Sequence, residues 1–288
     1  MINELTINDM KDKYLNYLVT FNAYDTFIFY RQHLRIICNF LFSINVINDD
    51  DIELTQIYEF IQSQKKGKVS NATINKRLGA FKRMLKYNKS PKYHIFTAVN
   101  RLKEDYKTFN YLDTNDIKKL ILYLNTTSTL SIRNKALISL MLDSGVRLNE
   151  LINIKLKFLD LTNNLITLDV TKTKNDRYIF FTDRTKEFLK SYVSKLNNPL
   201  LFPISKRTVR YIFDRVKRDL NFFYFSPHVL RHTYATILVN SNTNLEFIKI
   251  TMGHSNLKTT SRYLHFNQEI LHKQYKTHFT FCPGSATP

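Results

Sequence analysis

One short stretch of the chain limits the folds that it can adopt. Residues 165–181, LITLDVTKTKNDRYIFF, alternate apolar and polar side chains around a polar turn, which predicts two β-strands. Elsewhere the apolar residues recur at helical spacing. The sequence therefore predicts a mainly α-helical protein with a small β-sheet in its second domain. Helices are expected at 6–18, 26–42, 55–64, 70–88, 112–124, 131–145, 182–196, 205–220, 226–240, 244–253, 255–266 and 267–277.

Several of these helices carry end signals. Ser70 and Ser226 each precede a helical stretch as an N-cap, since their hydroxyls can accept from unpaired backbone N–H groups. Asp113 or Thr114 caps the first helix of the second half of the chain. Gly145 stands where a helix commonly ends in a left-handed residue.

Changes in pattern divide the chain into parts. Residues 1–90 are expected to form a helical domain, and residues 109–279 a second domain that holds the β insertion. Residues 91–108 begin with Pro91 and show little periodicity, which predicts a linker. Residues 280–288 differ in composition and predict a disordered tail.

The chain is strongly basic. Its 288 residues include 43 Lys and Arg against 24 Asp and Glu, a formal net charge of +19. Eight basic residues and no acidic residue lie from Lys65 to Lys86, so one helix offers a cationic face that can displace counterions from a duplex. A merely solvated helix face usually mixes both signs. The charge indicates a nucleic-acid partner, although a basic proteome or a ribosome-associated protein would also produce it.

Cysteine content and hydropathy bound the compartment. The only cysteines, Cys38 and Cys282, are far apart, which predicts neither a disulfide framework nor a zinc ribbon. The first residues carry acids without the apolar core of a signal peptide, and no run of 18 apolar residues is present. We expect a soluble cytoplasmic protein, associated with the nucleoid and without a membrane partner.

Two stretches concentrate polar side chains: HVLRH, which begins at His228, and GHSNLKTTSRYLHF, which begins at Gly253. His228 and His232 are four residues apart and could share a metal ion. A metalloprotease helix needs Glu after its first His, but Val229 stands there, and Arg231 would repel a cation. We therefore expect no metal site and no cofactor.

The same stretches suit phosphodiester chemistry without a metal. A tyrosine can attack phosphorus and form a covalent intermediate. Arginine can hold the nonbridging oxygens, where negative charge gathers, and histidine or lysine can move protons. The alternative is that these are satisfied structural side chains, which is the usual role of a lone histidine or tyrosine.

The motifs resemble those of the tyrosine recombinases, a superfamily that includes phage and transposon integrases and the Xer resolvases. HVLRH provides His228 and Arg231, and the second stretch provides His254 and, nine residues later, Tyr263. Other histidines and tyrosines nearby do not have this spacing. They are His232, His265, Tyr234 and Tyr275.

Two upstream boxes extend the resemblance over nearly the whole chain. DSGVRLNEL resembles the box with the first catalytic arginine, here Arg147, and its acidic partner Glu150. VTKTKNDRYIFF resembles the hairpin that bears the catalytic lysine. Lys172 is the preferred assignment, and Lys174 remains the alternative.

The resemblance implies a mechanism. Tyr263 would attack a scissile DNA phosphate and give a 3′-phosphotyrosine, while Arg147 and Arg231 clamp the nonbridging oxygens. The other implied roles are general acid for Lys172, general base for His228, phosphate hydrogen bonding for His254 and support for Glu150.

The resemblance also implies an architecture and partners. A helical core-binding domain and a catalytic domain would form a C-shaped clamp on double-stranded DNA, as a homodimer on an inverted-repeat core site and a homotetramer in the synapse. The chain would be the recombinase of a mobile element or phage. The alternatives are an Xer-type dimer resolvase, a type IB-like topoisomerase and a DNA-binding regulator without catalysis. The expected DNA contacts are Lys68, Asn75, Lys76, Arg77, Lys82, Arg83, Lys174, Lys206, Arg207 and Arg210.

Overall fold

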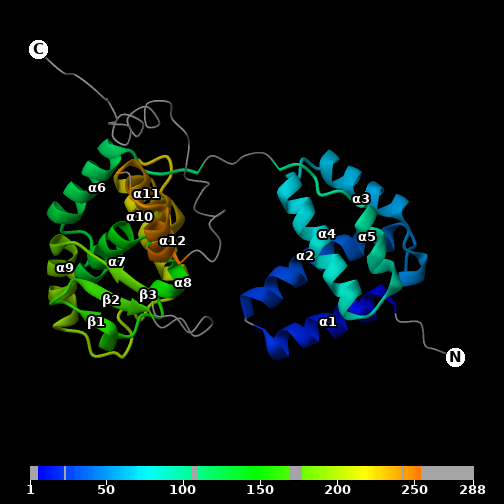
Figure 1. The fold of residues 1–288 in the computed structure, drawn as a ribbon, viewed down its shortest axis with the longest axis horizontal. Helices are drawn as coiled ribbons and strands as arrows, with labels where there is room; N and C mark the ends of the chain where they lie inside the picture. The colour runs from blue at the N-terminus through cyan, green and yellow to red at the C-terminus, as the bar shows by residue number, and fades with distance from the viewer. Residues whose placement is uncertain (1–5, 23, 105–108, 169–176, 242, 254–288) are drawn as a thin grey trace, which may run out of the picture. The chain divides into compact units, whose positions relative to one another are not determined.

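The chain folds as two compact units, residues 1–107 and 108–288, and each is described by itself. The first is built from helices, and the second combines helices with a small sheet that lies at one edge of the unit (Figure 1). This confirms the prediction of a mainly helical protein with a small sheet in its second part. The computed structural model describes residues 6–22, 24–104, 109–168, 177–241 and 243–253.

The first unit is a bundle of helices around an apolar core. The apolar stripe predicted for residues 70–88 faces this core, with Ile74, Phe81 and Leu85 fully buried. Ser70 caps its helix as predicted, because its hydroxyl accepts from the Thr73 N–H. The helices are α1 (Ile7–Phe21), α2 (Tyr24–Ser43), α3 (Leu54–Lys66), α4 (Asn71–Tyr87) and α5 (Ile95–Ala98), with short 3₁₀ turns at Asp49–Asp51 and Pro91–His94.

The segment that follows α4 is helical where an irregular linker was predicted. A 3₁₀ turn starts at Pro91 and runs directly into α5. Phe96 of α5 is buried against Phe81, with ring centroids 5.9 Å apart. The prediction took Pro91 as a breaker, but proline at the first position of a helix is favourable because no N–H is needed there.

The second unit is centred on α7 (Ile132–Ser144), which is buried along most of its length and packs on α9 and α11. This explains why α7 has no clear polar face. Among the described residues no helix is long and apolar enough to cross a membrane. The other helices are α6 (Thr114–Thr126), α8 (Leu148–Leu151), α9 (Asp183–Val193), α10 (Lys206–Asp219), α11 (Pro227–Asn240) and α12 (Leu245–Met252), with a 3₁₀ turn at Leu156–Phe158.

The sheet has three antiparallel strands in the order β1-β2-β3. Ile166 pairs with Ile179, and Leu168 pairs with Arg177, and all four side chains are buried. The two predicted strands are confirmed, whereas β1 was not predicted because two residues are too short to show a period. The strands are β1 (Leu159–Asp160), β2 (Leu165–Leu168) and β3 (Arg177–Phe180).

The predicted helix ends are confirmed in this unit. Asp113, not Thr114, caps α6, and Ser226 caps α11. Gly145 ends α7 in the left-handed region, with φ at 58°. A Cβ added there would lie 2.5 Å from the Tyr234 ring, so both the backbone and the packing require glycine.

Some predicted elements fall on segments that the structure does not describe. The two expected helices at 255–266 and 267–277, the tail at 280–288 and the turn between the predicted strands lie outside the described residues.

Candidate active site

Arg147 and Glu150 are placed by the abrupt end of α7. After Gly145 the chain turns at once into α8, with Arg147 at its N-cap. The Glu150 carboxylate accepts from the Arg147 backbone N–H at 2.8 Å and from its Nη1 at 2.9 Å. Arg147 Nη2 donates to the Gly253 carbonyl at 2.7 Å. Glu150, the predicted acidic partner, therefore accepts hydrogen bonds from both the backbone and the side chain of Arg147.

Arg231 approaches the same place from the first half of α11. Its side chain is buried, with 5% of its surface exposed. Nη1 donates to the Gly145 carbonyl and Nη2 to the Met252 carbonyl, each at 2.6 Å. The structure therefore brings the two predicted phosphate-binding arginines, Arg147 and Arg231, to the end of α12.

A third arginine, Arg177, joins them and was not predicted. It is the first residue of β3 and is 7% exposed. Nη1 and Nη2 donate to the two oxygens of Glu150, at 3.1 and 3.0 Å, and Nη1 also donates to the Met252 carbonyl at 3.0 Å. Burial lowers the pKa of Arg177, while Glu150 opposes that shift.

These residues form what we call the arginine cluster: Arg147, Arg177, Arg231, Glu150 and the carbonyls of Met252 and Gly253. Among the described residues the cluster has three guanidinium groups and one carboxylate: Arg147 and Arg177 donate to Glu150, and Arg231 donates to backbone carbonyls. The carbonyl end of α12 supplies further partial negative charge. Positive charge remains in excess, which favours an anion beside the cluster. Arg147 is the member that reaches solvent, since its side chain is 40% exposed against 7% for Arg177.

The two histidines of α11 have different environments. His228 lies in the first turn and is exposed, three residues before Arg231. His232 is partly buried, and its ring lies 4.4 Å from that of Phe109. Burial, with smaller effects from His228 and Arg231, lowers the pKa of His232 to about 4. His232 is therefore neutral near pH 7.

This low pKa predicts a measurable acid sensitivity. Between pH 6.5 and 4 the unfolded protein binds a proton at His232 that the folded protein does not, so stability falls as pH falls through this window. The wild-type free energy of unfolding should drop by about 1 kcal/mol per pH unit more than that of His232→Gln. Urea unfolding at pH 7, 6 and 5 measures this, and parallel pH profiles for the two proteins would contradict it.

The remaining predicted catalytic residues lie outside the described residues. They are Lys172, His254 and Tyr263, together with the alternative Lys174. The chain nevertheless leads to them from the cluster, because Gly253 directly precedes His254, and the segment with both lysines ends at Arg177. Their roles stay predictions.

Some of the expected DNA contacts on α4 already have partners within the first unit. The Asn75 amide donates to the Leu102 carbonyl at 2.9 Å and to Glu104 at 2.8 Å, and its oxygen accepts from the Leu102 N–H at 3.0 Å. Arg77 donates to Gln64, and Arg83 to the Tyr30 hydroxyl at 2.5 Å. Asn75 of α4 thus binds the segment after α5 through Leu102 and Glu104.

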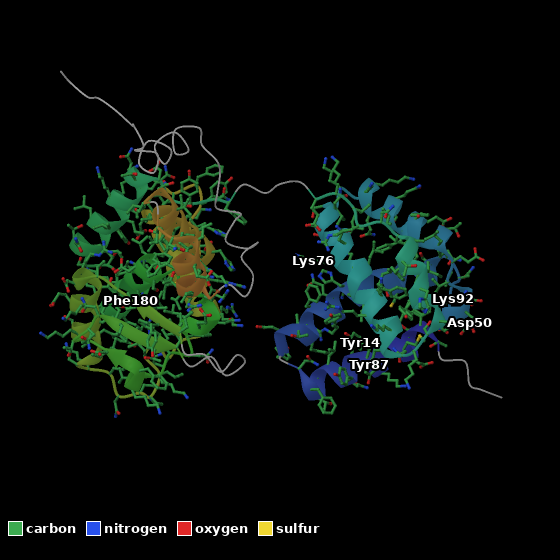
Figure 2. The ribbon with its side chains drawn as sticks, viewed as in Figure 1. Tyr14, Asp50, Lys76, Tyr87, Lys92 and Phe180 are labelled. Carbon is green, nitrogen blue, oxygen red and sulfur yellow. The ribbon has the colours of Figure 1, made fainter. Side chains whose placement is uncertain are left out.

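The other expected contacts in the described residues are exposed or partly buried. Lys68 and Lys76 are exposed, and Figure 2 shows Lys76 on α4; Lys82 is partly buried. On α10 Arg207 and Arg210 are exposed and Lys206 is partly buried. Arg207 also donates to the Tyr211 hydroxyl at 3.1 Å. Their role in binding DNA stays a prediction.

In the part of the chain that the structure describes, no group of three His, Cys, Asp or Glu could hold a metal ion. The arrangement instead offers arginine donors for a phosphate, an exposed histidine beside them, and a backbone that continues toward a tyrosine.

Known proteins are similar to this chain in sequence and in fold. Residues 110–269 match the model of the phage integrase family. The tyrosine recombinase XerC of Bacillus licheniformis is 27% identical over 286 residues, covering 92% of this chain and 93% of its own. XerA of Saccharolobus solfataricus is 31% identical over 212 residues, covering 73% and 69%. The Tn1549 transposon integrase, solved with a circular intermediate DNA, superposes with a TM-score of 0.77 at 17% identity, covering 95% and 99%.

Proposed function

The chain belongs to the phage integrase family of tyrosine recombinases, and on this basis we propose that it cleaves and rejoins DNA at a specific site through a 3′-phosphotyrosine. The observation that carries the proposal is the arginine cluster. It gathers an excess of positive charge next to the segment that holds His254 and Tyr263.

The proposed reaction builds up negative charge on the scissile phosphate, and positive side chains must offset this charge. The Tyr263 oxygen attacks phosphorus, the bond from phosphorus to the 5′ oxygen breaks, and a 3′-phosphotyrosine and a 5′ hydroxyl result. Negative charge grows on the nonbridging oxygens during this step. Arg147 and Arg231 offset it, and the hydrogen bonds that hold both side chains in advance avoid reorganisation during the reaction.

Two proton transfers complete the step. His228 takes the proton of the Tyr263 phenol, and Lys172 gives a proton to the departing 5′ oxygen. His254 donates a hydrogen bond to the phosphate, and Glu150 supports Arg147. Rejoining is the reverse: a 5′ hydroxyl attacks phosphorus, and the bond to Tyr263 breaks. No metal or nucleotide takes part in this scheme.

We further propose double-stranded DNA with an inverted-repeat core site as the substrate. One homodimer would bind each site, and a homotetramer would form the synapse, at the nucleoid in the cytoplasm. The Tn1549 integrase supports a role in a mobile element or phage. The XerC and XerA relatives support the alternative of a chromosome or plasmid dimer resolvase.

Covalent capture from cells tests the proposal. Cells expressing the wild type, or Tyr263→Phe as the control, are lysed under denaturing conditions, and the DNA that remains attached to protein is sequenced. We expect adducts with the wild type alone, converging on one inverted-repeat site. A site within the flanks of the gene would favour a mobile element, and a single chromosomal site elsewhere would favour the resolvase.

Other outcomes would contradict the proposal. Adducts scattered over the genome would indicate a topoisomerase, which uses the same chemistry without a specific site. The wild type could also bind DNA but form no adducts, either in cells or on a suicide duplex built from the flanks of the gene. The chain would then be a non-catalytic DNA-binding protein.

A further inference from the structure

Arg177 occupies a different position in the arginine cluster from Arg147 and Arg231. It donates to both oxygens of Glu150, and Glu150 in turn holds Arg147. It also donates to the Met252 carbonyl, the same oxygen that accepts from Arg231. Arg177 therefore links the two arginines that are proposed to bind the phosphate, without a hydrogen bond to either.

The burial of Arg177 separates its role from theirs. With 7% of its side chain exposed, it is enclosed, whereas Arg147 reaches solvent. A buried charge is costly unless its partners are well placed, and here they include one carboxylate and one carbonyl. Nη1 alone reaches the carboxylate and the carbonyl, and Nη2 donates to the second carboxylate oxygen. Lysine has a single nitrogen and cannot reproduce this pair of parallel hydrogen bonds to the carboxylate.

Gly253 shows how tightly this contact is built. A Cβ added to Gly253 would overlap Arg177 Nη1, and the carbonyl of the same residue accepts from Arg147. Glycine there lets the Arg177 guanidinium lie against the turn that leaves α12. The position of Arg147 thus depends on Arg177 through Glu150 on one side and through this turn on the other.

We propose that Arg177 is a positioning residue for strand cleavage: it holds Glu150 and the end of α12 so that Arg147 meets the scissile phosphate in the correct orientation. This inference rests on the proposed recombinase function. It assigns Arg177 no contact with DNA and no proton transfer.

The test compares three variants on one substrate. Arg177→Met removes the charge at similar size, and Arg177→Lys keeps the charge without the fork. Arg184→Met is the matched control, because Arg184 is likewise paired with a carboxylate, Asp143, at 3.0 Å, and its side chain is partly buried. The substrate is a nicked duplex of the site recovered by covalent capture. The readouts are the single-turnover rate of adduct formation, the Kd for the duplex and the melting temperature.

We expect both Arg177 variants to cleave about 100-fold more slowly than the wild type, with Kd within about twofold. Arg184→Met should lower the melting temperature by a similar amount and leave the cleavage rate nearly unchanged. Equal slowing in Arg184→Met would reduce the effect to lost stability and overturn the inference. Full activity of Arg177→Lys would show that charge alone suffices and would also overturn it.

Two further measurements separate positioning from general damage. In an Arg147→Ala background, Arg177→Met should add no more than about a fivefold loss, because it acts through Arg147. On a duplex with a neutral methylphosphonate at the scissile position, Arg177→Met should lower the cleavage rate by a smaller factor. The reason is that the charge that Arg147 offsets is absent from this duplex. The inference would be refuted if the rate loss of the double variant equalled the product of the losses of the two single variants. It would also be refuted if Arg177→Met slowed cleavage of the neutral duplex as much as that of the normal duplex.

The outcomes also distinguish this inference from the function on which it rests. If the wild type forms no adduct with the nicked duplex, both fail together. If the wild type cleaves and Arg177→Met cleaves at the same rate, the recombinase function stands and the positioning role fails.

Discussion

The Tyr263→Phe protein is expected to bind its DNA site like the wild type and to form no covalent adduct. Phenylalanine lacks the oxygen that attacks phosphorus, and loss of a nucleophile typically lowers the rate of cleavage by at least about 10,000-fold. Affinity should stay within about twofold, because affinity for DNA comes mainly from contacts with many phosphates. Gel-shift titration and denaturing electrophoresis on the same nicked duplex measure both quantities.

Tyr234→Phe provides the control for this experiment. Tyr234 lies in α11 near the arginine cluster, but its ring packs against Gly145, and burial raises the pKa of its phenol. A phenol that resists ionisation is a poor nucleophile. Tyr234→Phe should therefore keep adduct formation. If Tyr234→Phe lost the adduct and Tyr263→Phe kept it, the assignment of the nucleophile would be wrong.

Gly253→Ala is expected to slow strand cleavage by about 1,000-fold, although the change adds only a methyl group. Gly253 has φ at 61°, where a residue with a Cβ is strained by about 1–2 kcal/mol. The new Cβ would also displace the Arg177 guanidinium, and with it the bonds that hold Glu150 and Arg147. Single-turnover cleavage at saturating duplex measures the rate, and urea unfolding should show a loss of about 2 kcal/mol.

Gly79→Ala is the matched control. Gly79 lies within α4, and a Cβ added there meets nothing within 4 Å. Alanine should therefore raise the free energy of unfolding by about 0.5–1 kcal/mol and leave cleavage at saturating DNA unchanged. Should Gly253→Ala cleave within about threefold of the wild type, the tight contact between this turn and Arg177 would have no role in the reaction.

Much of the fold could be predicted because its signals are local. Hydroxyl and carboxylate caps such as Ser70, Asp113 and Ser226 mark helix starts, and Gly145 marks an end. Elements that depend on distant packing were missed. The short α5 forms because Phe96 finds a place in the core of the first unit, which no local pattern announces.

The site was predicted less completely, and Arg177 shows why. The apolar residues of RYIFF alone predict a strand, yet Arg177 is in phase with the buried Ile179. A charged side chain on the buried face of a strand needs partners, and this could have pointed to Glu150. The carbonyls of Gly145, Met252 and Gly253 could not have been found, because any residue type has a carbonyl.

The arginine cluster also has a consequence for the order in which the protein folds. Its hydrogen bonds join residues 106, 86 and 75 positions apart, from Arg147 to Gly253, from Arg231 to Gly145 and from Arg177 to Met252. Such distant pairs lose the most chain entropy on closing, so they form after the local helices. During synthesis the cluster cannot close before α12 has left the ribosome. A nascent chain therefore carries its basic helices well before its three arginines are held together.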